Sequence, residues 1–151
     1  MASVNIDNPK IVAHVRKIAR RGLKAIGLAY IGDVHVHHTG PRSGRMYYVP
    51  GTKTKYQASA DGESPAKRTS RLDMSMGTRI DEDDVGLVLF AGSNVAASAG
   101  KNQYPKLLER GSPGGKIAPR PMWRVAWLRN IGRYEAIWLA ATGVPLRLPQ
   151  G

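Results

Sequence analysis

The stretch 37–71 constrains this chain most, because it holds no sustained apolar repeat of helical or strand period. It is rich in Lys, Arg, Gly, Pro, Ser and Thr, and it contains Tyr47, Tyr48 and Tyr56. Loops longer than about 12–15 residues are uncommon in compact domains, and are usually functional or disordered. Disordered segments are typically poor in aromatic residues. We therefore expect an arm over about 35–71 that is either floppy or ordered by something outside the subunit, and the tyrosines favour order.

Length and composition limit the remaining possibilities. A chain of 151 residues fits a single domain over 1–151, with a core large enough to fold. It has no cysteine, so disulfides and thiolate metal sites are excluded, and a reducing compartment is expected. No apolar run reaches the roughly 18 residues of a membrane span, and the first residues lack a signal-peptide pattern. The net charge of +12 favours polyanionic partners, namely DNA, RNA or an acidic protein face.

The first predicted element is a long helix. Asn8 is a suitable N-cap and Pro9 a suitable first helical residue, and Gly32-Asp33 is the predicted end. One apolar stripe follows steps of three and four through Ile11, Val15, Ile18, Gly22, Ile26 and Ala29. The remaining faces carry Lys10, Arg16, Lys17, Arg20, Arg21 and Lys24.

Two strands are expected after the arm. Leu72–Ile80 alternates loosely, and Val85–Ala91 is an apolar run typical of a central strand. The acidic turn Asp81–Asp84 between them predicts a hairpin. A short helical turn at Tyr104–Gly111 should follow, closed by its glycine.

A second long helix is predicted over 121–141. Its aromatic stripe is more typical of a core or a subunit interface than of a ligand site, and consists of Trp123, Trp127, Tyr134 and Trp138. Residues 143–151, with two prolines, should form an extended tail. The predicted class is α+β: a small antiparallel sheet packed by two long helices, with the long basic loop between the first helix and the sheet.

The sequence gives little support for a catalytic site or a metal site. His35, His37 and His38 form an H-x-H-H cluster with no nearby carboxylate except Asp33, so a polar entry into the loop is the preferred interpretation. Asp81–Asp84 lacks the ligand spacing of a calcium-binding loop, and we interpret it as a solvated hairpin tip or a contact for a neighbour's basic arm. There is no nucleophile elbow and no phosphate-binding loop. We expect no enzyme activity, no catalytic residue, no metal and no cofactor.

Several segments resemble, in order, a family of phage tail components. Tyr104–Ser112, a glycine-bearing link and then Ala118–Met122 resemble the closing motif of the tail-completion, or head–tail joining, proteins of long-tailed bacteriophages. Gly40–Arg45 is similar to the family's basic glycine-rich loop. Ala58–Ala66 followed by Thr69–Leu72 is similar to its short proline motif before the first strand. Ser70 and Asp61 depart from the family's common glycine and proline, at positions that would carry no chemistry.

The resemblance implies a structural virion protein that forms a ring at the head–tail junction, and the expected ring is a hexamer. The ring would be assembled in the host bacterial cytoplasm between the connector or stopper, the tail terminator and the tail tube, with no membrane involved. Genomic DNA would pass through it without sequence-specific contacts. Aromatic residues are enriched in interface cores, so the predicted subunit contacts are Tyr47, Tyr48, Tyr56, Tyr104, Trp123 and Trp127. The predicted contacts to DNA or an acidic partner are Arg42, Arg45, Lys53, Lys55, Lys67 and Arg68.

Two other classes of function remain open. One is a monomeric or dimeric nucleic-acid-binding module that uses the basic first helix and the 37–71 loop. Its binding would weaken steeply as salt rises. The other is a nuclease, which would need clustered carboxylates for metal-assisted hydrolysis. Asp81–Asp84 is the only candidate for such a cluster.

Overall fold

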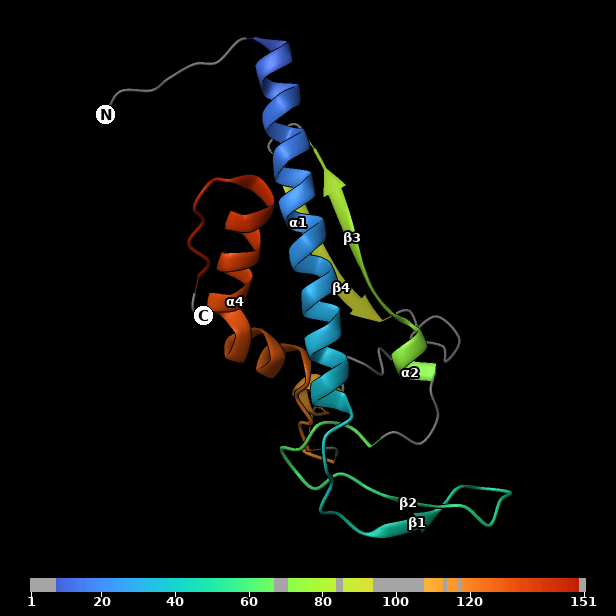
Figure 1. Cartoon of the computed structure of the whole chain (residues 1–151). Helices are drawn as coiled ribbons and strands as arrows, with labels where there is room; N and C mark the ends of the chain where they lie inside the picture. Colours follow the sequence, from blue (N-terminus) through green and yellow to red (C-terminus); the bar gives the residue numbers. More distant parts are fainter. Residues whose placement is uncertain are drawn as a thin grey trace.

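The computed structural model describes residues 8–66, 71–83, 86–93, 108–112, 114–116 and 118–149. The predicted α+β class is confirmed (Figure 1). Two long helices pack together, and one of them also carries a two-stranded antiparallel sheet, while a second hairpin projects from the end of the molecule. In chain order the elements are α1 (Pro9–His38), β1 (Met46–Tyr48), β2 (Lys55–Gln57), α2 (Arg71–Met74), β3 (Met76–Glu82), β4 (Leu87–Ser93) and α4 (Trp123–Thr142).

Helix α1 begins as predicted but ends later. The side-chain oxygen of Asn8 accepts a hydrogen bond from the Lys10 N–H (3.0 Å), with proline at the start of the helix. The predicted end at Gly32-Asp33 is wrong, because the apolar stripe continues beyond it. Tyr30, Val34 and His38 follow at steps of four and are all buried, so packing holds the last turns in place.

The histidines consequently lie on the helix and not in a loop entry as predicted. His35, His37 and His38 occupy the last turn of α1. Nδ1 of His38 lies 3.5 Å from Oδ1 of Asp73, and Nδ1 of His35 lies 3.7 Å from the same oxygen. Within the described ranges, no three such side chains form a group suited to a metal ion.

Helix α4 confirms the predicted second helix, and a distant glutamate caps it. Met122, the residue before the helix, provides no side-chain cap. The carboxylate of Glu109 instead accepts hydrogen bonds from the N–H groups of Met122 (2.9 Å), Trp123 (3.2 Å) and Arg124 (2.9 Å). A negative charge at this end of a helix is stabilising. Gly143, with a φ of 73°, closes the other end.

The hydrophobic core lies mainly between α1 and α4. Its most buried large side chains are Tyr134, Ile26, Met122 and Val34. Tyr30 contacts Trp123, Trp127 and Tyr134 edge to face, and the rings of Trp127 and Tyr134 stack with centroids 5.1 Å apart. The aromatic stripe predicted for the second helix therefore packs within the subunit's own core.

The predicted hairpin between the two strands is confirmed, but its strand β4 is not a central strand. Strands β3 and β4 pair antiparallel, with Thr78 opposite Ala91, and form a two-stranded sheet in the described part of the chain. Leu89 packs against the core, whereas Val88 and Phe90 on the other face are 47% and 46% exposed. The side chains of this apolar run therefore alternate: one face of β4 packs against the core, and the other is exposed to solvent.

The beginning of the predicted first strand is a helical turn instead. Residues Arg71–Met74 form α2, and the Ser75 hydroxyl donates to the Leu72 carbonyl oxygen (2.7 Å). Leu72 is buried, which places this turn against the core. Of the predicted turn Tyr104–Gly111, the described residues 108–110 are helical and Gly111 follows with a φ of 78°.

The last described segment, 143–149, folds back along α4. Leu146 and Leu148 pack against the core, and the Leu148 N–H donates to Oε1 of Glu135 (2.7 Å). The predicted tail is therefore irregular in conformation but held to the domain as far as residue 149. None of the described helices combines the length and apolarity that a bilayer crossing requires.

Candidate subunit-interface arm

Residues 40–63 form the projecting part of the molecule, which we call the arm. Its strands β1 and β2 pair antiparallel, with Tyr47 opposite Tyr56. The turn between them is closed by hydrogen bonds from the N–H of Val49 to the Thr54 oxygen (2.9 Å) and from the N–H of Thr52 to the Val49 oxygen (3.0 Å). The hairpin extends sideways from the foot of α1, away from the helices (Figure 1).

The outer part of the arm, the hairpin 46–57 that we call its tip, exposes apolar and aromatic side chains. Met46, Tyr47 and Tyr48 are 57%, 48% and 61% exposed. The Lys55 ammonium lies 5.1 Å from the ring centre of Tyr48, and the rings of Tyr47 and Tyr56 lie 6.0 Å apart. Rings stiffened by neighbours in this way lose little conformational entropy when a partner covers them.

A single carboxylate organises the base of the arm. Oε1 of Glu63 accepts a hydrogen bond from the Ser43 hydroxyl (2.6 Å), and Oε2 accepts from the N–H groups of Ser43 (3.1 Å) and Ala60 (2.8 Å). These bonds, led by the one from the Ser43 hydroxyl, lower the pKa of Glu63. The charged carboxylate therefore links by hydrogen bonds the two segments at the base of the arm: the one that leaves the domain, at Ser43, and the one that returns to it, at Ala60 and Glu63.

Arg42 stabilises the base of the arm by donating hydrogen bonds to backbone carbonyl groups. Its guanidinium donates to the oxygens of Gly40 (2.6 Å), Pro41 (2.9 Å) and Pro65 (3.1 Å), and to that of His38 at the end of α1. It fixes the arm to the helix from which the arm departs. These bonds occupy much of the donor capacity that contacts to DNA would need.

Gly44 permits the close approach of the two segments. Its N–H donates to the Ala58 oxygen (3.0 Å), and a Cβ at this position would lie 2.6 Å from that same oxygen. The N–H of Gly62 further donates to the Pro119 oxygen (3.1 Å), which links the arm to the segment before α4. The expectation that the arm is either floppy or ordered from outside the subunit is therefore wrong for its base, which contacts within the same chain fix.

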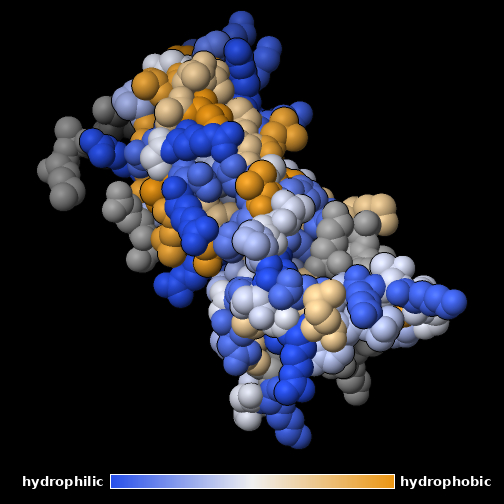
Figure 2. Space-filling model, turned by 60° about the horizontal axis from the view of Figure 1, so that its bottom comes forward, coloured by the Kyte–Doolittle hydropathy of each residue, from blue (hydrophilic) through white to orange (hydrophobic). Residues whose placement is uncertain are grey.

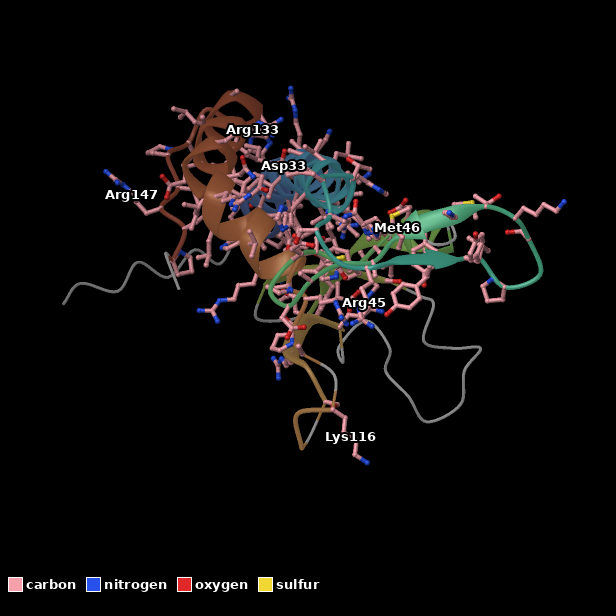
Figure 3. All side chains as sticks on the ribbon, turned by 90° about the horizontal axis from the view of Figure 1, so that it is seen from below. Asp33, Arg45, Met46, Lys116, Arg133 and Arg147 are labelled. Carbon is pink, nitrogen blue, oxygen red and sulfur yellow. The ribbon has the colours of Figure 1, made fainter. Side chains whose placement is uncertain are left out.

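The predicted basic contacts divide into three groups. Arg45, Lys53 and Lys55 are exposed on the arm, and Arg45 extends from the ribbon beside Met46 in Figure 3. Arg42 is half-buried in the base. Lys67 and Arg68 lie outside the described residues. Figure 2 shows the arm end of the molecule covered mainly by hydrophilic residues, with few hydrophobic ones between them.

The predicted aromatic contacts divide similarly. Tyr47 and Tyr48 are exposed on the arm, and Tyr56 is partly buried beside them. Trp123 and Trp127 are partly buried in the core between α1 and α4. Tyr104 lies outside the described residues.

The acidic hairpin turn contacts the protein's own first helix. Glu82 forms ion pairs with Arg16 (3.1 Å) and Arg20 of α1. Asp81 pairs with Arg79 (2.9 Å), and Asp84 lies outside the described residues. The turn is therefore not merely a solvated tip, and a contact with a neighbour's basic arm stays a prediction. The sequence did not predict the pairing of Glu82 with α1 or the bonds between Glu63 and Ser43, because both join residues far apart in the chain and leave no local pattern.

Comparison with known proteins identified no relative. No family model matches the chain, and no curated protein or solved structure resembles it significantly.

Proposed function

We propose that this protein is a structural subunit of the neck of a long-tailed bacteriophage. It forms an oligomeric ring, a hexamer by the family resemblance, that completes the tail top and joins it to the head connector. Its partners are further copies of itself and the neighbouring stopper, terminator and tube proteins, and genomic DNA passes through the ring. The ordered set of sequence motifs between Gly40 and Met122 supports this proposal, with the geometry of the arm.

The observation that carries the proposal is the contrast between the base and the tip of the arm. The base is fixed within the subunit by Glu63 and Arg42, whereas Tyr47 and Tyr48 at the tip remain about half exposed or more. An isolated two-stranded hairpin is marginally stable in water. A hairpin that is held outward and covered by the next subunit would be ordered at little entropic cost, and would bury aromatic anchors of the kind that dominate interface energies.

The β3–β4 sheet has a second exposed apolar surface. Val88 and Phe90 are exposed on the face of β4 that points away from the core, and Arg79 lies with its guanidinium 5.0 Å from the Phe90 ring centre. Exposed aromatic residues beside an arginine are characteristic of interface cores. Two such surfaces, on the arm and on the sheet, suit a ring in which each subunit contacts two neighbours through different patches.

The location of the protein in virions tests the proposal directly. Phage particles would be labelled with an antibody against the protein and viewed by electron microscopy. Label at the head–tail junction supports a neck component. Label absent from particles would overturn the proposal and leave the nucleic-acid-binding module as the first alternative.

The role of the arm is tested separately by complementation. A phage lacking the gene would be supplied with the wild-type protein, with Tyr47→Ser/Tyr48→Ser, or with Leu128→Ser as the control. Leu128 is also exposed (41%) but lies on α4. We expect the arm variant to be folded and to leave heads and tails unjoined, while the control restores particles. Normal joining by the arm variant would exclude the arm tip as an essential contact.

A further inference from the structure

The exposed half of α1 has three different faces. Lys10, His14, Lys17, Arg21 and Lys24 follow at steps of four, three, four and three, so they form one stripe along the helix. All five side chains are exposed. We call Lys10, Lys17, Arg21 and Lys24 the cation stripe.

The second face is basic as well, but it is engaged within the fold. Arg16 and Arg20 point to the β3–β4 hairpin and pair with Glu82. The third face is apolar. Its residues, among them Val15 and Ala19, line a groove together with Trp138 of α4 and residues of the 143–149 segment. Hydrophilic and hydrophobic residues lie side by side over the upper part of the molecule in Figure 2.

The cation stripe differs from Arg16 and Arg20 in having no acidic partner in the described part of the chain. Among the residues that the structure describes, no carboxylate lies within 4.0 Å of its ammonium and guanidinium groups. From Lys10 to Lys24 the helix rises about 21 Å, at 1.5 Å per residue. Figure 1 shows the first turns of α1 extending beyond the end of α4, and the four side chains of the stripe are all exposed.

We infer that the cation stripe binds the phosphate backbone of duplex DNA. The four cations are spread over about 21 Å of helix, so each can contact a separate phosphate of the duplex backbone. The stripe offers flexible cations, and the only other side chain within it is a histidine. Contacts from Lys and Arg to phosphate oxygens carry no sequence information, so binding through them would be independent of sequence.

An acidic protein surface fits the stripe less well. Protein–protein interface cores are depleted in Lys and enriched in aromatic residues, and the stripe has three lysines and no aromatic ring. For a ring, the sequence predicted DNA contacts on the arm, where Arg42 proves to be committed to backbone carbonyls. The basic first helix was expected to bind nucleic acid only in the alternative function, a nucleic-acid-binding module. The inference rests on the proposed function only for the source of the DNA, which would be the genome passing through the ring.

Binding of labelled duplex DNA by the purified protein tests the inference. Fluorescence anisotropy with a 24-base-pair duplex of mixed sequence would be measured across a salt series. The stripe variant is Lys10→Gln/Lys17→Gln/Arg21→Gln/Lys24→Gln. The matched control removes four exposed cations elsewhere: Lys116→Gln/Arg124→Gln/Arg129→Gln/Arg147→Gln. Lys116 and Arg147 extend away from the body in Figure 3.

Both variants lose the same net charge, so only position distinguishes them. For the stripe variant we expect the slope of log K against log salt to fall by about 3–4, at roughly 0.9 per lost phosphate contact. The affinity should fall at least about tenfold at 0.1 M salt, and the control should change the slope by less than about 1. Unchanged circular dichroism would establish that both variants are folded, and Lys17→Gln/Arg21→Gln provides a milder second test.

Two results would overturn the inference. One is equal loss of binding in both variants, which would indicate attraction by overall charge alone. The other is displacement of the DNA by polyglutamate at equal charge, which would point to an acidic protein partner. The virion labelling is independent of these results, so failure of the ring proposal and failure of the cation stripe are distinguishable.

Discussion

The hydroxyl of Tyr134 donates a 2.8 Å hydrogen bond to Oδ2 of Asp33, and so joins the middle of α4 to the last third of α1. Arg133 pairs with the other carboxylate oxygen, and the two labelled residues Asp33 and Arg133 lie together in Figure 3. Tyr134 is fully buried. Burial raises the pKa of Tyr134, and the bond to Asp33 raises it further, so the hydroxyl remains a donor.

Replacing Tyr134 with Phe should therefore destabilise the helix pair without creating a cavity. A hydrogen bond to a charged group contributes about 1.5–3 kcal/mol, and we expect a loss near the lower end because Arg133 still pairs with Asp33. Urea unfolding followed by circular dichroism measures the loss. Tyr47→Phe on the exposed arm is the control and should change the free energy of unfolding little. Equal stability of the two variants would contradict the role given to Asp33.

Gly22 allows α1 and α4 to approach closely. A Cβ at Gly22 would lie 2.5 Å from Cε3 of Trp138 and 2.7 Å from Cγ2 of Thr142. Overpacking costs about 1–3 kcal/mol, and the better helix propensity of Ala offsets up to about 1 kcal/mol of it. We expect Gly22→Ala to lower the free energy of unfolding by roughly 1–2 kcal/mol.

Gly32 on the same helix provides the matched control for Gly22. A Cβ there would meet nothing within 4 Å. Gly32→Ala should therefore raise the free energy of unfolding by about 0.5–1 kcal/mol, through helix propensity alone. If both substitutions stabilise the protein, the packing of Trp138 against Gly22 is not as described.

Substitution of Trp127 tests whether the aromatic stripe contributes to the stability of the core. Its ring stacks on Tyr134 and meets Tyr30 edge to face, although it is only partly buried. Truncating a buried tryptophan costs about 3–5 kcal/mol, so we expect about 3 kcal/mol for Trp127→Ala. Leu128→Ala, at the next and exposed position, should cost under about 1 kcal/mol. A near-zero cost at Trp127, measured by thermal or urea unfolding, would place that ring outside the core.

Glu63 gives the arm a defined dependence on pH. Its pKa is lowered in the folded protein, so its contribution to stability is fully present above the unfolded pKa of about 4.3. That contribution is lost as the pH falls through the lower folded pKa. Glu63→Gln should therefore lower the thermal midpoint at pH 7, and the difference from wild type should shrink below about pH 4.

Asp61 supplies the control for this titration, because it is an exposed acid two residues away. Asp61→Asn should leave the midpoint at pH 7 close to that of the wild type. A constant difference between wild type and Glu63→Gln from pH 7 to pH 3 would mean that the charge of Glu63 does not hold the arm base.

Periodic signals predicted the helices well because they are local. The start of α1 follows from its Asn8-Pro9 cap, and the extent of α4 follows from apolar residues at steps of three and four. The hairpin of β3 and β4 follows from two apolar segments around an acidic turn. Each signal involves residues close in sequence, so no tertiary contact is needed to read it.

The errors arose where distant residues overrode local preference. Gly32-Asp33 reads as a helix end, yet Asp33 is held by Tyr134 and Arg133 of α4, and α1 continues through the buried Val34. The 37–71 stretch has the sequence of an unstructured loop. In the structure, however, Glu63 and Arg42 form hydrogen bonds with backbone groups and fix the base of the arm. Hydrogen bonds to backbone atoms place almost no demand on the partner's residue type, so the sequence carries no trace of them.

By itself, therefore, the sequence determined the α+β class, the two long helices and the excess of positive charge. Only the tertiary structure decided which charges are used within the fold. Arg16, Arg20 and Arg42 are engaged by Glu82 and by backbone carbonyls, whereas Lys17 and Arg21 on the same helix face solvent. The physical reason is that a helical pattern fixes the direction of each side chain about its axis, but the partner in that direction comes from another part of the chain.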